Sequence, residues 1–248
     1  MANPAAGTTP KGTQDERQAA NWVQAMFAEI APRYDLLNHL LSFNIDRGWR
    51  KALLSHLQPL LARREAIVLD LCCGTGDVML DLQSVSAARV LGADFCHPML
   101  VSAQRKAAAK GYAASLFEAD ALALPIGCAI LDAISIGFGF RNLVNYAEGL
   151  QELHRVLKPG GTLAILEFSH PRGAVIRSLY NCYSRAVLPV LGSLVSGSRE
   201  AYAYLPESIE KFPRAEKLQQ MIAASGFSQT RFVLLSGGIA ALHTGVKG

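Results

Sequence analysis

Residues 68–77, Val-Leu-Asp-Leu-Cys-Cys-Gly-Thr-Gly-Asp, carry an apolar run into a glycine turn with an acidic residue on each side. Gly74 and Gly76 lack a Cβ atom, so the chain can turn sharply and a ligand can lie against bare backbone amides, with Thr75 between them. The dinucleotide pattern G-x-G-x-x-G needs a third glycine where this chain has Met79. The turn therefore favours a nucleoside cofactor without a pyrophosphate, and it suggests S-adenosylmethionine (SAM).

Acidic residues at the ends of predicted strands are further candidates for binding this cofactor. Asp94, followed by Phe95, lies about twenty residues after the turn, where a carboxylate can accept hydrogen bonds from both ribose hydroxyls. Asp120 and Ala121 follow the next strand and are expected at the adenine edge. Asp70, beneath the turn, is expected to bind the turn's amides or a methionine ammonium group. The alternatives are a helix N-cap for Asp94 and an ordinary turn residue for Asp120.

The segment 137–142, Gly-Phe-Gly-Phe-Arg-Asn, combines two glycines and two aromatic rings with a cation and an amide. It follows the fourth predicted strand, and ligands of such sheets lie outside the carboxyl ends of the strands. We expect the acceptor, with Phe138 against it, to meet the methyl group here, and Gly137 to contact the cofactor. Arg141 is expected to orient a hydroxyl or hold a water as proton acceptor, and Asn142 to hydrogen-bond to a ring oxygen. The alternative for Arg141 is a structural role.

A sheet is needed to position these residues, and the apolar pattern predicts seven strands. They are expected at 67–71, 89–94, 115–118, 131–137, 162–168, 228–235 and 239–246. Helical segments separate most of them, which predicts a parallel α/β sheet covered on both faces. Residues 236–238, Ser-Gly-Gly, leave only hairpin spacing before the last strand, so that strand is expected to be antiparallel. This Rossmann-like arrangement resembles the class I SAM-dependent methyltransferase fold.

Composition bounds the function classes. The chain has 248 residues, half of them apolar and 18% charged, which fits one globular domain with a substantial core. The net charge of +4 is too small to indicate nucleic-acid binding, and the sequence has no Lys/Arg run. The five cysteines form no C-x-x-C pair, so we expect free thiols in a reducing cytosol and no metal site. No signal peptide is recognisable, and a cytoplasmic location is expected.

Three segments are expected around the sheet within one domain, 14–248. Residues 1–13 are predicted to be a disordered tail and 14–62 an N-terminal helical cap. Residues 171–208 are predicted to be a helical lid insertion, because the stretch 175–204 is apolar and aromatic-rich and has several arginines. Such a face is expected to rest on an anionic membrane surface or to wall a lipid tunnel. The alternative is a homodimer interface or additional core.

Five blocks of this chain resemble the signature blocks of the ubiquinone/menaquinone biosynthesis C-methyltransferase family. They are 27–38 (FAEIAPRYDLLN), 137–142 (GFGFRN), 154–161 (HRVLKPGG), 166–169 (LEFS) and 204–208 (YLPES), in family order. The resemblance implies methyl transfer from SAM to a ring carbon of a polyprenylated quinol precursor. It also implies that Arg141 and Asn142 assist proton loss through water, and that Arg33, Tyr34 and Asn38 close the pocket.

Two details of the resemblance bear on the ligands. Some family members have serine where this chain has Gly137, so a cofactor contact through that hydroxyl is absent here. The Cys72-Cys73 pair resembles menaquinone-type members more than ubiquinone-type ones. The expected acceptor is therefore demethylmenaquinol. The alternatives are a benzoquinol precursor of ubiquinone, or a catalytically silent partner in a quinone-biosynthesis complex.

Overall fold

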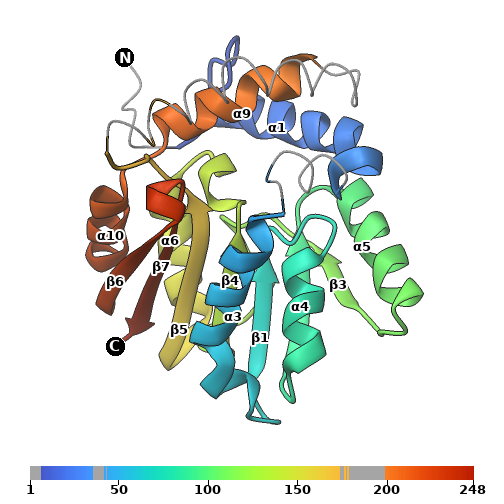
Figure 1. Ribbon diagram of the computed structural model, residues 1–248. Helices are drawn as coiled ribbons and strands as arrows, with labels where there is room; N and C mark the ends of the chain where they lie inside the picture. Colours follow the sequence, from blue (N-terminus) through green and yellow to red (C-terminus); the bar gives the residue numbers. More distant parts are fainter. Residues whose placement is uncertain (1–6, 36–41, 43, 174–175, 177, 179–198) are drawn as a thin grey trace.

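A computed structural model describes residues 7–35, 42, 44–173, 176, 178 and 199–248 (Figure 1). Its centre is a seven-stranded sheet in the order β3-β2-β1-β4-β5-β7-β6. The strands are β1 (Ile67–Leu71), β2 (Arg89–Asp94), β3 (Ser115–Glu118), β4 (Leu131–Gly137), β5 (Leu157–Phe168), β6 (Phe227–Leu235) and β7 (Ala240–Lys247). Chain order reverses between β1 and β4, which makes the carboxyl ends of these two strands the expected place for a ligand.

The predicted strands are confirmed, with one difference at β5. That strand begins at Leu157 and not at Thr162, because Leu157 already pairs with Leu131. A register shift then absorbs residues 158–161, where Gly160 has a φ of +77°. The expected antiparallel strand is also confirmed. β7 runs antiparallel to both β5 and β6, and η4 (Ser236–Gly238) makes the short connection.

Helices cover both faces of the sheet. α3 (Asp46–Leu61), α4 (Asp77–Val85) and α5 (His97–Ala109) pack on one face, and α6 (Tyr146–Val156) and α10 (Ala215–Ala224) pack on the other. α3 presents Trp49, Leu53, Leu57 and Leu61 to the sheet at intervals of four residues. Part of the expected helical cap, 14–62, is therefore a layer of the α/β sandwich.

Two helices cross the carboxyl ends of the parallel strands. α1 (Glu16–Ile30), which continues into η1 (Ala31–Arg33), lies beside α9 (Arg199–Lys211) at the top of Figure 1. The rings of Trp22 and Tyr204 join them, with centroids 5.1 Å apart. Most of the expected lid lies outside the described residues, namely 174–175, 177 and 179–198. The lid was expected to end at 208, but α9 continues to Lys211.

The expectation of a disordered tail through residue 13 is wrong for the part that the structure describes, which begins at Gly7. Thr8 is buried, and its backbone N–H donates to the Leu143 carbonyl at 2.8 Å. The Thr8 hydroxyl is hydrogen-bonded to the Tyr204 hydroxyl at 2.8 Å. Small polar residues gave no apolar signal, yet their polar groups find partners on α9 and on the loop after β4.

Candidate active site

A cavity opens where β1, β2 and β4 end, beneath α1. Six of the expected cofactor residues line it: Gly74, Asp94, Phe95, Asp120, Ala121 and Gly137. Three of the expected catalytic and substrate residues also line it: Tyr34, Phe138 and Asn142. The structure thus brings together residues that are far apart in sequence, as the rule for ligands at the carboxyl ends of strands predicts.

Asp94 fastens the glycine turn to the end of β2. Its carboxylate accepts the Gly74 backbone N–H at 2.8 Å and the Cys96 backbone N–H at 2.9 Å. Burial raises the pKa of Asp94 to about 6, against the lowering effect of these backbone donors. Asp94 lines the cavity, so its remaining acceptor capacity is available to a ligand there.

The backbone of the turn adopts conformations that favour glycine. Gly74 has a φ of +53° and Gly76, the residue before α4, a φ of +85°. A Cβ on Gly76 would also lie 3.1 Å from the Cβ of Ala103 on α5. Both glycines are thus required by local geometry. Gly74 alone of the two lines the cavity.

Asp70 lies beneath the turn and does not line the cavity. Its Oδ1 accepts the Ser135 hydroxyl at 2.8 Å, and its Oδ2 is buried without a hydrogen-bond partner. Burial raises the pKa of this carboxyl to about 7. The carboxyl therefore takes up a proton far more readily than an exposed aspartate does.

The loop after β4 packs directly against the turn after β1. A Cβ on Gly139 would lie 2.3 Å from the Cβ of Cys72, so only glycine fits at this position. Both Cys72 and Phe138 have positive φ values, +55° and +59°, which are uncommon for residues with side chains. Strained backbone in both loops thus coincides with the cavity that they line. A Cβ on Gly137 would meet Val78 at 2.8 Å, which leaves little room for the serine of some family members.

Arg141 is buried behind the cavity lining and is paired with Glu167 of β5. Its Nη1 lies 3.0 Å from Glu167 Oε1, and its backbone N–H donates to Glu167 Oε2 at 3.1 Å. Nη1 also donates to the Phe138 carbonyl, and Nε to the Ser208 hydroxyl at 3.4 Å. Burial lowers the pKa of Arg141, but the neighbouring Glu167 carboxylate raises it. The pKa of Arg141 therefore lies above its ordinary value. A permanently protonated guanidinium cannot itself accept a proton.

The cysteines around the site are free thiols among the described residues, and Cys182 lies outside them. Burial raises the pKa values of Cys72 and Cys73 well above that of an exposed thiol. Both side chains therefore stay neutral and unreactive near pH 7. In the described part of the chain, no group of three or more His, Cys, Asp or Glu residues could hold a metal ion.

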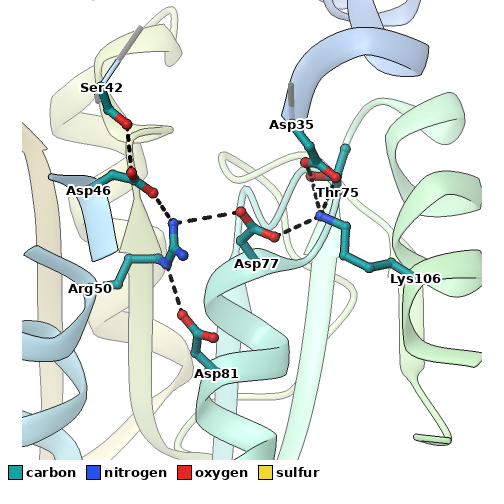
Figure 2. A network of polar contacts seen from close by, with 8 residues as sticks. All are labelled: Asp35, Ser42, Asp46, Arg50, Thr75, Asp77, Asp81 and Lys106. Carbon is teal, nitrogen blue, oxygen red and sulfur yellow. Dashed lines mark hydrogen bonds and ion pairs between the residues drawn. The ribbon is translucent and has the colours of Figure 1, made fainter. Parts of the chain in front are cut away.

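A network of ion pairs ties the N-terminal segment to the glycine turn (Figure 2). Lys106 of α5 lies 2.5 Å from Asp35 Oδ2 and 2.7 Å from Asp77 Oδ1. The Thr75 hydroxyl donates to Asp35 Oδ1 at 2.5 Å and accepts from Lys106 at 3.2 Å. The Thr75 side chain is therefore held by protein partners, and the hydroxyl does not line the cavity.

Arg50 of α3 continues the network on the other side of α4 (Figure 2). It pairs with Asp46 one turn earlier, with Asp77 at 3.6 Å and with Asp81 at 2.8 Å. The Ser42 hydroxyl donates to Asp46 at 2.6 Å. The chain on both sides of residues 36–41 is thus anchored to the start of α4, with Asp77 between the two cations.

Two of the predicted substrate residues are not found in the cavity lining. Arg33 lies in η1 and does not line the cavity, and Asn38 lies outside the described residues.

Other site residues are revealed by the structure and not by the sequence. Met99, Leu122 and Leu143 line the cavity without having been predicted. Their apolar side chains carry no chemical signal of their own. Only the contacts of α5 and of the loops after β3 and β4 reveal them.

The similarity of the chain to known proteins covers almost all of it. A model described as the ubiE/COQ5 methyltransferase family matches residues 12–247. A demethylmenaquinone methyltransferase of Thermus thermophilus is 50% identical over 221 residues, which are 89% of this chain and 99% of that protein. A demethylmenaquinone methyltransferase of Deinococcus radiodurans is 46% identical over 235 residues, 94% of this chain and 95% of that protein.

A solved structure shares the fold at low sequence identity. The SAM dependent methyltransferase from Aquifex aeolicus superimposes with a TM-score of 0.58 at 18% identity. The superposition covers 79% of this chain and 89% of that one. The two chains therefore share the overall fold.

Proposed function

Because the chain belongs to the ubiE/COQ5 methyltransferase family, we propose that it methylates a ring carbon of demethylmenaquinol to give menaquinol. It is a SAM-dependent methyltransferase of quinone biosynthesis. The observation that carries the choice of acceptor is the nearly full-length similarity to two proteins named demethylmenaquinone methyltransferase. The Cys72-Cys73 pair supports the same choice.

The lining of the cavity supports an assignment of its residues to SAM. Asp94, which lines the cavity, would accept from the ribose hydroxyls. Asp120 would accept from the adenine amine beside Ala121, and the backbone of Gly74 and Gly137 would lie against the cofactor. When bound, SAM supplies an electrophilic methyl group beside the aromatic residues of the loop after β4.

The remaining lining residues support the recognition of a quinol. An electron-rich ring carbon beside a hydroxyl needs mainly to be held in line with the methyl group. Phe138 and Tyr34 would contact the ring, and Asn142 would hydrogen-bond to a ring oxygen. Since Arg141 stays protonated and lies behind the cavity lining, its role would be to hold a water that reaches the ring oxygen, and a water or the solvent would carry away the ring proton.

The acceptor can be tested with purified protein and SAM labelled in its methyl group. We expect label in the naphthoquinol when reduced demethylmenaquinol is offered, and far less with the demethyl benzoquinol precursor of ubiquinone. The oxidised quinone should take up little label, because its ring carbon is electron-poor. Preference for the benzoquinol would overturn the choice of acceptor. Failure to bind SAM in calorimetry would support the silent-partner alternative.

We also propose that the protein works in the cytoplasm at the inner face of the membrane. None of the helices in the described ranges is long and apolar enough to cross a membrane. The reason for the proposal is the polyprenyl tail of the acceptor, together with the apolar, arginine-containing sequence of residues 175–204. Flotation with vesicles that contain anionic lipids should carry the protein upward, and less so at high salt. If the protein forms a homodimer and does not bind the vesicles, the alternative is favoured, in which this segment is a homodimer interface.

A further inference from the structure

One side chain in the cavity lining is held by a helix that has no role in the proposed reaction. The Tyr204 hydroxyl of α9 donates to Asn142 Oδ1 at 3.0 Å. The same hydroxyl is hydrogen-bonded to the Thr8 hydroxyl at 2.8 Å. Both Tyr204 and Thr8 are buried, and Asn142 lines the cavity.

The donors in this group can be assigned from the number of hydrogens. A tyrosine hydroxyl has one hydrogen, and here it points to the oxygen of the Asn142 amide. Thr8 must then donate to the Tyr204 oxygen, which leaves both hydroxyls satisfied. With its oxygen engaged by Tyr204, Asn142 has its amide nitrogen, a donor, left for a ligand.

The same helix also contacts the neighbour of Asn142. One turn after Tyr204, the Ser208 hydroxyl accepts from Arg141 Nε at 3.4 Å. Tyr204 and Ser208 lie in the block 204–208 that resembles the family signature, and they contact both members of the Arg-Asn pair. This placement supplies a physical reason for two polar residues four positions apart on one helix.

We propose that Tyr204 is a positioning residue that fixes Asn142 as a hydrogen-bond donor toward the ring oxygen beside the methylated carbon. This inference rests on the proposed function. A donor at that oxygen stabilises its ionised form more than its neutral form, because hydrogen bonds to charged acceptors are the stronger ones. Ionisation of the hydroxyl in turn makes the adjacent ring carbon more nucleophilic.

Tyr204→Phe removes the hydroxyl and keeps the ring that packs on Trp22, Val23 and Met26. The matched control is Tyr146→Phe, which removes another buried tyrosine hydroxyl, the one that donates to the Arg141 carbonyl at 3.0 Å. Tyr204→Phe loses two hydrogen bonds and Tyr146→Phe loses one, in each case close to the pair. Only Tyr204→Phe should release the Asn142 amide.

The experiment compares SAM affinity by calorimetry and methyl transfer to reduced demethylmenaquinol as a function of pH. For Tyr204→Phe we expect parental SAM affinity and a kcat lower by about 10- to 100-fold, the range of one hydrogen bond to a charged group. The acidic limb of its kcat profile, which reports ionisation in the enzyme–substrate complex, should move to higher pH by about one unit. Tyr146→Phe should leave the position of that limb unchanged.

A second measurement does not depend on turnover. Ultraviolet titration of 1-naphthol bound beside S-adenosylhomocysteine reports the ionisation of a ring hydroxyl in the cavity. Its midpoint should lie higher in Tyr204→Phe than in the parent and in Tyr146→Phe. If Tyr204→Phe changes neither the acidic limb of the pH–rate profile nor the midpoint of the ultraviolet titration, and lowers only the thermal stability, Tyr204 is merely structural and the inference is wrong. A parent protein that does not methylate the naphthoquinol would instead refute the proposed function.

Discussion

Replacing Asp94 with alanine is expected to weaken SAM binding by at least about 100-fold, since two hydrogen bonds to a charged acceptor are lost. The carboxylate is buried at the end of β2, and Asp94 lines the cavity. It also holds the Gly74 and Cys96 amides, so its loss loosens the turn against which the cofactor would lie. Calorimetry on protein shown to be folded by circular dichroism measures the effect.

Asp120→Ala is the matched control for this variant. Asp120 lines the same cavity, but its side chain is exposed and holds only the Leu122 amide, so a loss of about tenfold or less is expected. Affinity of the parent should also fall below about pH 6, because the Asp94 carboxylate then takes up a proton and one acceptor becomes a donor. Asp94→Ala should lack this pH dependence.

If Asp94→Ala binds SAM as tightly as the parent does, the ribose assignment is wrong.

Arg141→Ala is expected to abolish turnover and to lower the free energy of unfolding by about 3–5 kcal/mol, the usual cost of breaking a buried ion pair. The side chains of Arg141 and Glu167 are 6% and 1% exposed, so the remaining carboxylate would be left without compensation. SAM affinity should stay near that of the parent, because Arg141 does not line the cavity. Denaturant unfolding, calorimetry and the methyl-transfer assay together measure the three quantities.

Arg141→Lys separates the two effects. Lysine keeps a positive charge beside Glu167, so most of the stability should return. It lacks the planar fork that reaches Glu167, Ser208 and the Phe138 carbonyl together. We therefore expect a folded variant with turnover still reduced by at least about tenfold, the loss of one charged hydrogen bond. A fully active lysine or alanine variant would assign the orienting role to another residue.

The sheet was predictable from sequence because its signals are local. Buried parallel strands read as short apolar runs, and residues 236–238 left only a hairpin connection before the last strand. The layers around the sheet were harder to predict. α3 has the same helical period as α1, and only contacts with β4, β5 and β7 show that it belongs to the sandwich.

The site was predictable where strand ends and residue types point to it, as for Asp94, Asp120 and Asn142. Their binding roles stay predictions, although the structure brings them to one cavity. The pairing of Arg141 with Glu167 and the contact of Tyr204 with Asn142 were not predictable. Each contact joins segments that are separated in the chain. The type of a polar residue, such as Arg141 or Tyr204, does not indicate which residue it will pair with.

The place of β7 in the sheet has a consequence for folding. β5 pairs with β7 along its outer side, and β7 follows β6 in the chain. Until β7 is in place, the N–H and C=O groups of that side of β5 have no strand partner. β6 and β7 are close in sequence, so they can pair first and then add to β5 as a hairpin. This late, non-local step would be the first to fail in a destabilised chain, and it would expose the edge of β5 to pairing between molecules.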